Sequence, residues 1–375
     1  MRKRTGRQVR DFDRGEKLRL TLLAAFTLFC FLAALAVPCL LAAAPPERAP
    51  PPLVAELQRM VDVDGAPGVA VRVYRNGRLL YTASAGEDFT EAAVPVASAS
   101  KWVAAALILT LVDDGLLSLD EPIGRRLPEM HGEAAGVTLR QLLSYTSGHE
   151  GLTAGVDIRQ PPDITLRESA RQIAERPLAA RPGEEFRYGG PGLQIAGALA
   201  EQATGQSWAE LFQRRLAGPL GMTQSRWSHP RDVPNGAEPA RNPNLQAGLI
   251  TTAEDYGRFL TMLAQDGRYA GRRVLSSASI QAMSEPQTLG LRMAYTPPGV
   301  TGSLQYDLGN WCEDTPPSPS CRRMSSPGAL GTYPWLDLNS GLYGVFVTRI
   351  RLPRIAPRIQ AARRIIEAEA ARSAP

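Results

Sequence analysis

The chain has 375 residues, with 42 Lys and Arg against 37 Asp and Glu, and a formal net charge of +5. Residues 1–44 contain eight of the basic and three of the acidic side chains, so the whole excess lies in this segment and the body is neutral. A neutral body excludes the broad basic surface that nucleic acids bind, and we expect no nucleic-acid partner. Its length allows one large domain or two modest ones.

An apolar run covers residues 20–44, "LTLLAAFTLFCFLAALAVPCLLAAA". At about 1.5 Å per residue this run can cross a bilayer, and it exceeds the roughly 7–15 apolar residues of a secretory signal. We therefore expect a transmembrane anchor, with a cleaved signal segment as the alternative. The positive-inside bias places the basic tail, residues 1–19, in the cytoplasm. The body is then expected in the periplasm or another extracytoplasmic space, attached to the membrane through its N-terminal segment.

Two cysteines of the body, Cys312 and Cys321, stand close together in "WCEDTPPSPSC". In an oxidising compartment such a pair favours a disulfide over a metal site, and two unrelated free thiols are the alternative. No histidine lies nearby in the sequence to complete a zinc site, so we expect no metal.

The first elements of the body follow from local sequence patterns. Residues 45–52, "PPERAPPP", predict a stiff proline-rich linker, and a short helix is expected over 53–62. Residues 68–86 alternate apolar and polar side chains around a central Asn-Gly, which predicts a β-hairpin. Residues 98–114 predict a helix that stops at a glycine and is buried, because it is apolar on nearly every face.

The middle of the chain, roughly residues 119–250, has helical patterns joined by polar loops, whereas strand patterns return near the C-terminus. The expected helices are 139–145, 193–204, 208–216 and 251–267, and the expected strands are 306–311, 331–338 and 342–350, before a terminal amphipathic helix. Strands near both ends, with no recurring βαβ alternation, predict an antiparallel sheet flanked by helices. The predicted fold class is α/β of the α+β type, one domain over residues 53–375 with an inserted helical subdomain.

Lys101 is the only lysine after residue 17, in a chain that otherwise uses arginine. Lysine, unlike arginine, can lose its proton when it is desolvated. Ser98 lies three residues earlier, so on a helix the two side chains share a face with Cβ atoms about 5–6 Å apart. A buried apolar helix and its positive N-terminal end both lower the proton affinity of the lysine. The pair therefore indicates a nucleophile and its base, with chance spacing as the alternative.

Other catalytic classes have less support. The three histidines, His131, His149 and His229, lie in loop-like contexts, and we expect them to be solvated. The chain lacks the G-x-S-x-G elbow that many Ser-His-Asp hydrolases carry. It also lacks a glycine-rich phosphate loop with a lysine, so nucleotide chemistry has no support.

Three segments resemble the serine β-lactamase and penicillin-recognising family: "VASASKWVAAALILTLVDDGLLSLDEPIGRRLPE", "VTLRQLLSYTSG" and "PGEEFRYGGPGLQIAGALAEQATGQSWAELFQRRLAGPLGMT". The resemblance covers most of residues 60–350. It points to the branch that holds class C β-lactamases, D-Ala-D-Ala carboxypeptidases and related esterases. It implies the β-lactamase/transpeptidase-like fold and no metal or organic cofactor. It also implies that Ser98 is the acyl-forming nucleophile and Lys101 its proton acceptor.

The family's second motif, Tyr-x-Asn, is altered in this chain. It reads Tyr188-Gly189-Gly190, which keeps the tyrosine that shuttles protons but lacks the amide side chain. Gly190, although it occupies a substrate-binding position of the family, cannot hydrogen-bond a substrate acylamide. Taken alone, a tyrosine beside a Gly-Gly turn is also an ordinary structural feature.

The third motif, Lys/His-Thr/x-Gly, corresponds best to Ser326-Pro327-Gly328, which by itself also fits an ordinary turn. By this resemblance Ser326 and Gly328 line the substrate site, and the Ala329 amide joins the Ser98 amide as an oxyanion donor. Ser326 replaces a cation that can bind a substrate carboxylate, unless Arg322 or Arg323 substitutes. Penicillins and D-Ala termini carry that carboxylate, so its loss favours other esters or amides.

Four aromatic residues near the third motif are candidates to line the pocket, with core or rim packing as the alternative: Tyr306, Trp311, Tyr333 and Trp335. Together these features predict an exported serine hydrolase that forms an acyl-serine intermediate. The expected substrates are small carboxylic esters or amides, including cell-wall-derived ones. The alternatives are a D-Ala-D-Ala carboxypeptidase or weak β-lactamase, and a catalytically silent envelope binding module.

Overall fold

The computed structural model describes residues 46–151, 163–228, 240–300, 305–315 and 318–372. The basic tail and the apolar segment predicted at residues 1–44 lie outside these ranges. Within the described ranges, no helix combines the length and apolar character that a membrane crossing requires. Residues 46–375 belong to one compact unit.

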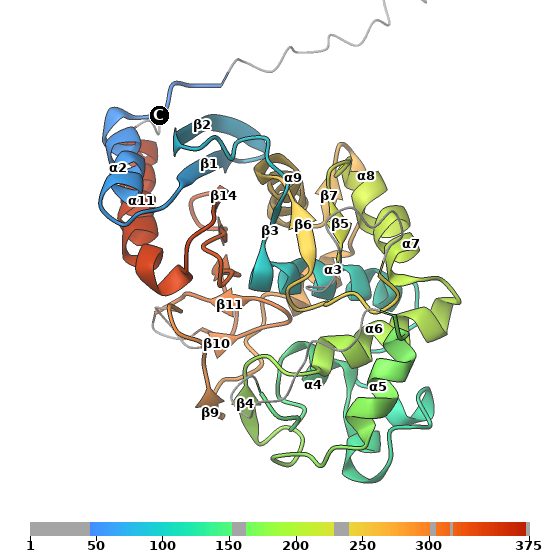
Figure 1. Ribbon diagram of the computed structural model, residues 1–375. Helices are drawn as coiled ribbons and strands as arrows, with labels where there is room; N and C mark the ends of the chain where they lie inside the picture. The colour runs from blue at the N-terminus through green and yellow to red at the C-terminus, as the bar shows by residue number, and fades with distance from the viewer. Residues whose placement is uncertain (1–45, 152–162, 229–239, 301–304, 316–317, 373–375) are drawn as a thin grey trace, which may run out of the picture. The chain divides into compact units, whose positions relative to one another are not determined.

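A seven-stranded antiparallel sheet joins the two ends of this unit (Figure 1). The first and last strands along the chain, β1 and β14, pair directly, with Val69 opposite Thr348. The predicted hairpin is present as β1 and β2, and the antiparallel sheet built from both ends of the body is confirmed. In order the strands are β10 (Gln305–Tyr306), β11 (Trp311–Cys312), β12 (Arg323–Ser325), β13 (Tyr333–Asp337), β14 (Leu342–Thr348), β1 (Gly68–Arg75) and β2 (Arg78–Gly86).

Two helices, α2 (Pro51–Asp62) and α11 (Leu352–Arg372), pack together on one face of the sheet (Figure 1). Helix α2 begins at Pro51, so the predicted linker over 45–52 is two residues too long. Proline suits the first helical turn because the N–H that it lacks would have no intrahelical acceptor there. On this face Arg363 of α11 donates to Glu313 Oε2 at 2.8 Å, and both side chains are almost fully buried.

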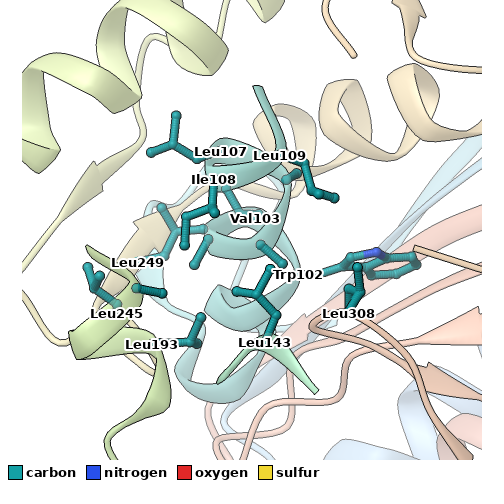
Figure 2. Packing of buried hydrophobic residues seen from close by; sticks show 14 of the residues in the cluster. Trp102, Val103, Leu107, Ile108, Leu109, Leu143, Leu193, Leu245, Leu249 and Leu308 are labelled. Atoms are coloured by element: carbon teal, nitrogen blue, oxygen red, sulfur yellow. The ribbon is translucent and has the colours of Figure 1, made fainter. Parts of the chain in front are cut away.

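The other face of the sheet carries the larger core, which surrounds helix α3 (Ser100–Asp113). Every residue of α3 from Ser100 to Leu111 is buried, as its all-round apolar sequence predicts. Figure 2 shows leucines of several other segments around α3, including Leu143, Leu193 and Leu249. Helix α9 (Ala253–Ala264) contacts β1, β13 and β14 and completes this layer.

The remaining elements connect these layers. The helices are α4 (Leu139–Leu143), α5 (Leu166–Ala174), α6 (Gly192–Thr204), α7 (Trp208–Phe212), α8 (Gly218–Leu220) and α10 (Ser277–Ala282). The short strands are β3 (Val94–Pro95), β4 (Glu185–Arg187), β5 (Arg226–Trp227), β6 (Leu249–Thr251), β7 (Arg268–Tyr269), β8 (Arg272–Arg273) and β9 (Arg292–Tyr295). The pair β4–β9 is parallel, unlike the main sheet.

One predicted strand is wrong. The segment 306–311 is not a continuous strand: residues 307–310 form a turn between β10 and β11, because the Asp307 N–H donates to the Asn310 C=O at 2.9 Å and the chain reverses there. The three-residue strand β12, which pairs with β11 and β13, has no signal of its own in the sequence.

Candidate active site

Ser98 lies in a single 3₁₀ turn, Ala97–Ala99, that leads directly into α3. Its neighbours hold this turn firmly: Tyr256 Oη donates to Ala99 C=O at 2.7 Å, and Ser100 Oγ accepts from the Leu249 N–H at 3.0 Å. Ala97 has a φ of 47°, a conformation that an alanine rarely adopts. Ser98 itself is only partly buried, so its hydroxyl stands at the accessible end of a buried helix.

The Lys101 amine contacts the Ser98 hydroxyl. Lys101 Nζ donates to Ser98 Oγ at 2.9 Å and to the Gln246 carbonyl at 3.0 Å. The lysine is 2 % exposed, and the removal of its amine from water lowers the pKa of Lys101 to about 7. Near neutral pH a large fraction of this amine is therefore uncharged, and an uncharged amine can accept the proton of a serine.

Tyr188 completes the group. It follows β4, and Lys101 Nζ lies 4.7 Å from the centre of its ring. Burial raises the pKa of Tyr188, and the side chains of Ser98 and Trp311 offset only part of that rise. The phenol therefore keeps its proton at neutral pH and is suited to donate it.

Aromatic rings pack around Tyr188. The rings of Tyr145, Tyr306 and Trp311 have centroids 5.5, 5.8 and 5.3 Å from that of Tyr188. Their packing keeps water from the tyrosine and the lysine. Tyr333 and Trp335 belong to the core on the α11 face of the sheet, so for these two the packing alternative is confirmed.

The third-motif turn lies directly against the nucleophile. Ser326 Oγ donates to the Ser98 carbonyl at 3.3 Å. A Cβ at Gly328 would overlap the Val96 carbonyl, so only glycine allows the turn to approach this closely. Ala329 is exposed, and its N–H makes no backbone hydrogen bond within the described residues.

The departures from the family motifs have structural consequences. Gly190 has a φ of +88°, and a Cβ placed there would overlap the Glu150 carbonyl. Backbone therefore occupies the direction in which a side chain at position 190 would extend. Arg322 donates to the Leu338 carbonyl and Arg323 pairs with Glu367 of α11. Both arginines are held away from Ser326, so neither supplies the missing cation.

One expectation for the histidines is wrong. His149 is 6 % exposed, its Nδ1 lies 3.0 Å from Ser147 Oγ, and burial lowers its pKa to about 4. It is thus a neutral buried residue beside the Glu150–Gly190 contact, and its loop-like sequence gave no sign of this burial. His131 is exposed, as expected, and His229 lies outside the described residues.

The two body cysteines form the disulfide Cys312–Cys321, with Cα atoms 5.7 Å apart. Asp314 lies close to both sulfurs. Sulfurs in a disulfide are not thiolates, so this group cannot act as a cysteine metal site. The bond ties β11, which carries Trp311, to the segment that leads into β12.

A mixed α/β fold with a serine–lysine pair at the start of a central helix defines a class of serine acyl-transfer enzymes. The Beta-lactamase family profile matches residues 54–369. The chain belongs to this family and is a serine hydrolase.

Individual relatives carry different descriptions. Protein Rv1367c of Mycobacterium tuberculosis is 26% identical over 78% of this chain and 84% of its own length. Esterase EstB of Burkholderia gladioli is 34% identical over 41% of this chain and 45% of its own length. Penicillin-binding protein 4 of Amycolatopsis lactamdurans is 30% identical over 58% of this chain and 65% of its own length.

Solved structures agree on the fold. A Bacteroides dorei protein provisionally described as a β-lactamase is 33% identical with a TM-score of 0.71, over 83% of this chain and 96% of that one. A family VIII carboxylesterase has a TM-score of 0.67 at 19% identity, over 85% and 99% of the two chains, and shows the shared fold alone.

The Gly190 geometry predicts a substitution effect. Gly190→Ala should lower the free energy of unfolding by about 1–3 kcal/mol, because it adds a Cβ at positive φ against the Glu150 carbonyl. Denaturant unfolding measures this loss. Gly136→Ala is the matched control, since a Cβ there meets nothing within 4 Å. A Gly190→Ala variant as stable as the control would contradict the described backbone.

Proposed function

We propose that the protein hydrolyses carboxylic esters or amides through an acyl-Ser98 intermediate. The observation that carries this proposal is the 2.9 Å contact between Ser98 Oγ and an amine whose pKa burial lowers to about 7. Neutral Lys101 takes the hydroxyl proton as Oγ attacks the substrate carbonyl carbon. The Ser98 and Ala329 amides stabilise the resulting oxyanion. Tyr188 then donates a proton to the leaving alcohol or amine.

The same groups act in deacylation, where the proton transfers run in the opposite direction. A water molecule attacks the acyl carbon, and its proton passes to the basic group of the Lys101–Tyr188 pair. The bond between Ser98 Oγ and the acyl carbon then breaks, and Oγ regains a proton. The products are a carboxylic acid and free enzyme, so the cycle needs no metal or organic cofactor.

The substrate class follows from the charges that the site lacks. Ser326 stands where a cation would hold a substrate carboxylate, and Arg322 and Arg323 are bonded elsewhere. Gly190 offers no amide for an acylamide side chain, and neighbouring backbone fills that direction. These features favour esters and amides without a carboxylate beside the scissile bond. The similarity to esterase EstB supports the same substrate class.

A second candidate is a D-Ala-D-Ala carboxypeptidase or a weak β-lactamase, acting on cell-wall-derived substrates. Similarity to Penicillin-binding protein 4 favours it. A catalytically silent binding module is the least supported reading, because the chain keeps the Ser98–Lys101 contact and the desolvation that activates it.

We further propose that the enzyme is exported and held at the membrane by residues 20–44. The sequence of this segment is apolar and follows a basic tail. The disulfide Cys312–Cys321 supports export, since such bonds persist in oxidising compartments. The enzyme would then act in the periplasm or another extracytoplasmic space.

The assigned roles predict covalent labelling of one serine. Incubation with an activated fluorophosphonate should add one adduct at Ser98, located by mass spectrometry of peptides. Lys101→Arg should slow this labelling by at least about 100-fold, because arginine keeps its proton.

Ser98→Ala is the control for labelling at other sites. Circular dichroism of each variant verifies its fold. A folded wild-type protein that forms no adduct would sink the enzyme mechanism, and normal labelling of Lys101→Arg would refute the role of the lysine.

Substrate choice separates the two enzymatic candidates. The wild-type enzyme should hydrolyse p-nitrophenyl esters of short acids and leave a chromogenic cephalosporin intact, because Ser326 stands where a cation is needed and the neighbouring Arg322 and Arg323 are bonded elsewhere. Ser326→Lys tests the cause, since an added cation should improve the kcat/KM for the cephalosporin relative to that for the ester. Faster cephalosporin than ester hydrolysis by the wild type would favour the second candidate.

A further inference from the structure

The turn between β10 and β11, residues 307–310, contacts both helix α3 and the third-motif turn that carries Ser326. A Cβ at Gly309 would lie 2.6 Å from Ala105 Cβ and 2.8 Å from the Lys101 carbonyl, so the turn lies directly against α3. The Gly309 carbonyl is 3.5 Å from Ser326 Oγ. Leu308 belongs to the apolar cluster around α3 (Figure 2). The position of this turn therefore bears on both Lys101 and Ser326.

A buried acid and a buried amide close the turn. The Asp307 N–H donates to the Asn310 carbonyl at 2.9 Å, and Asn310 Nδ2 donates to Asp307 Oδ2 at 2.8 Å. Both residues have no exposed surface. The second oxygen of Asp307, Oδ1, and the only side-chain oxygen of Asn310, Oδ1, are both buried without a hydrogen-bond partner among the described residues.

The two unpaired oxygens have one simple explanation. An ionised carboxylate and an amide oxygen both only accept hydrogen bonds, so they cannot satisfy each other. One proton on the Asp307 carboxyl turns its second oxygen into a donor, and the acid and amide can then form two hydrogen bonds in a ring. A buried acceptor without a partner destabilises the folded state, which favours the protonated form.

The electrostatic surroundings act in the same direction. Burial raises the pKa of Asp307 well above its ordinary value, the hydrogen bond from Asn310 lowers it, and the nearby Asp314 raises it. The adjacent Tyr306 also has a raised pKa, so it is neutral. On α3 the turn meets the Lys101 backbone, while Lys101 Nζ is bonded to Ser98 and Gln246.

We propose that Asp307 is a positioning residue that functions as a neutral carboxylic acid, and that its proton joins it to Asn310 and holds the turn against Lys101 and Ser326. The positioning part rests on the roles given above to Ser98 and Lys101. The protonation part does not, because it can be measured without turnover.

Asp307→Asn tests the protonation. The variant keeps a side chain that can pair twice with Asn310 but has no proton to lose. Because the pKa of Asp307 is raised on folding, the stability that its proton gives is complete below the unfolded pKa of about 3.9 and is lost as pH rises through the folded pKa. The difference in Tm, variant minus wild type, should therefore increase as pH rises from 4. A difference that is constant or decreases would overturn the neutral acid.

Activity tests the positioning. The ratio of kcat/KM, Asp307→Asn to wild type, should be within about threefold of one at pH 6 and increase toward alkaline pH, where only the wild type loses its pairing. Asp307→Ala breaks the ring and should lower kcat about tenfold or more, since the reacting groups shift. Asn310→Ala breaks the same ring from the other side and should match it.

The outcomes separate the two proposals. Equal kcat losses in Asp307→Asn and Asp307→Ala, or a folded Asp307→Ala with wild-type kcat, would overturn the positioning role. A wild type that hydrolyses no ester at any pH would defeat the proposed function, while the Tm comparison would still decide the protonation of Asp307.

Discussion

The chemistry of this protein depends on the removal of one amine from water. Lys101 has 2 % of its surface exposed, and its desolvation lowers a pKa that in water would keep the amine charged at every physiological pH. The helix that causes this desolvation is buried over its first twelve residues. The same burial that forms the core of the domain therefore creates the base. The buried lysine lowers the free energy of unfolding, because a charged amine is costly to remove from water.

The sheet supplies the other half of the site. Two turns approach the start of α3 so closely that a side chain would not fit: Gly309 lies against Lys101 and Gly328 against Val96. A third turn brings Gly190 against the Glu150 carbonyl, where a Cβ would not fit either. The Gly328 turn places Ser326 directly against the nucleophile Ser98. The third removes a substrate contact that family members have. The proposed reacting groups, Ser98 and Lys101, thus lie at the start of α3, whereas the surrounding turns restrict which substrates can enter the site.

Local patterns in the sequence predicted much of this arrangement. The hairpin of β1 and β2, the buried helix and the pairing of Ser98 with Lys101 follow from periodicity and spacing, which act over a few residues. Strand β12 was missed because its three residues carry no periodic signal and form a strand only through pairing with β11 and β13. The burial of His149 was missed for a related reason. It lies in a loop-like sequence, and only the packing of distant segments shows that water is excluded from it.

The most direct test of the account is a titration of Lys101 itself. The chain has only three lysines, so ¹³C-lysine labelling gives three side-chain signals, and the Lys101→Arg variant identifies the one of interest. We predict that this signal titrates with a midpoint near pH 7, well below the ordinary lysine pKa of about 10.4. A Lys101 midpoint at the ordinary value would contradict the account, because the amine would then stay charged at neutral pH and could not accept the proton of Ser98.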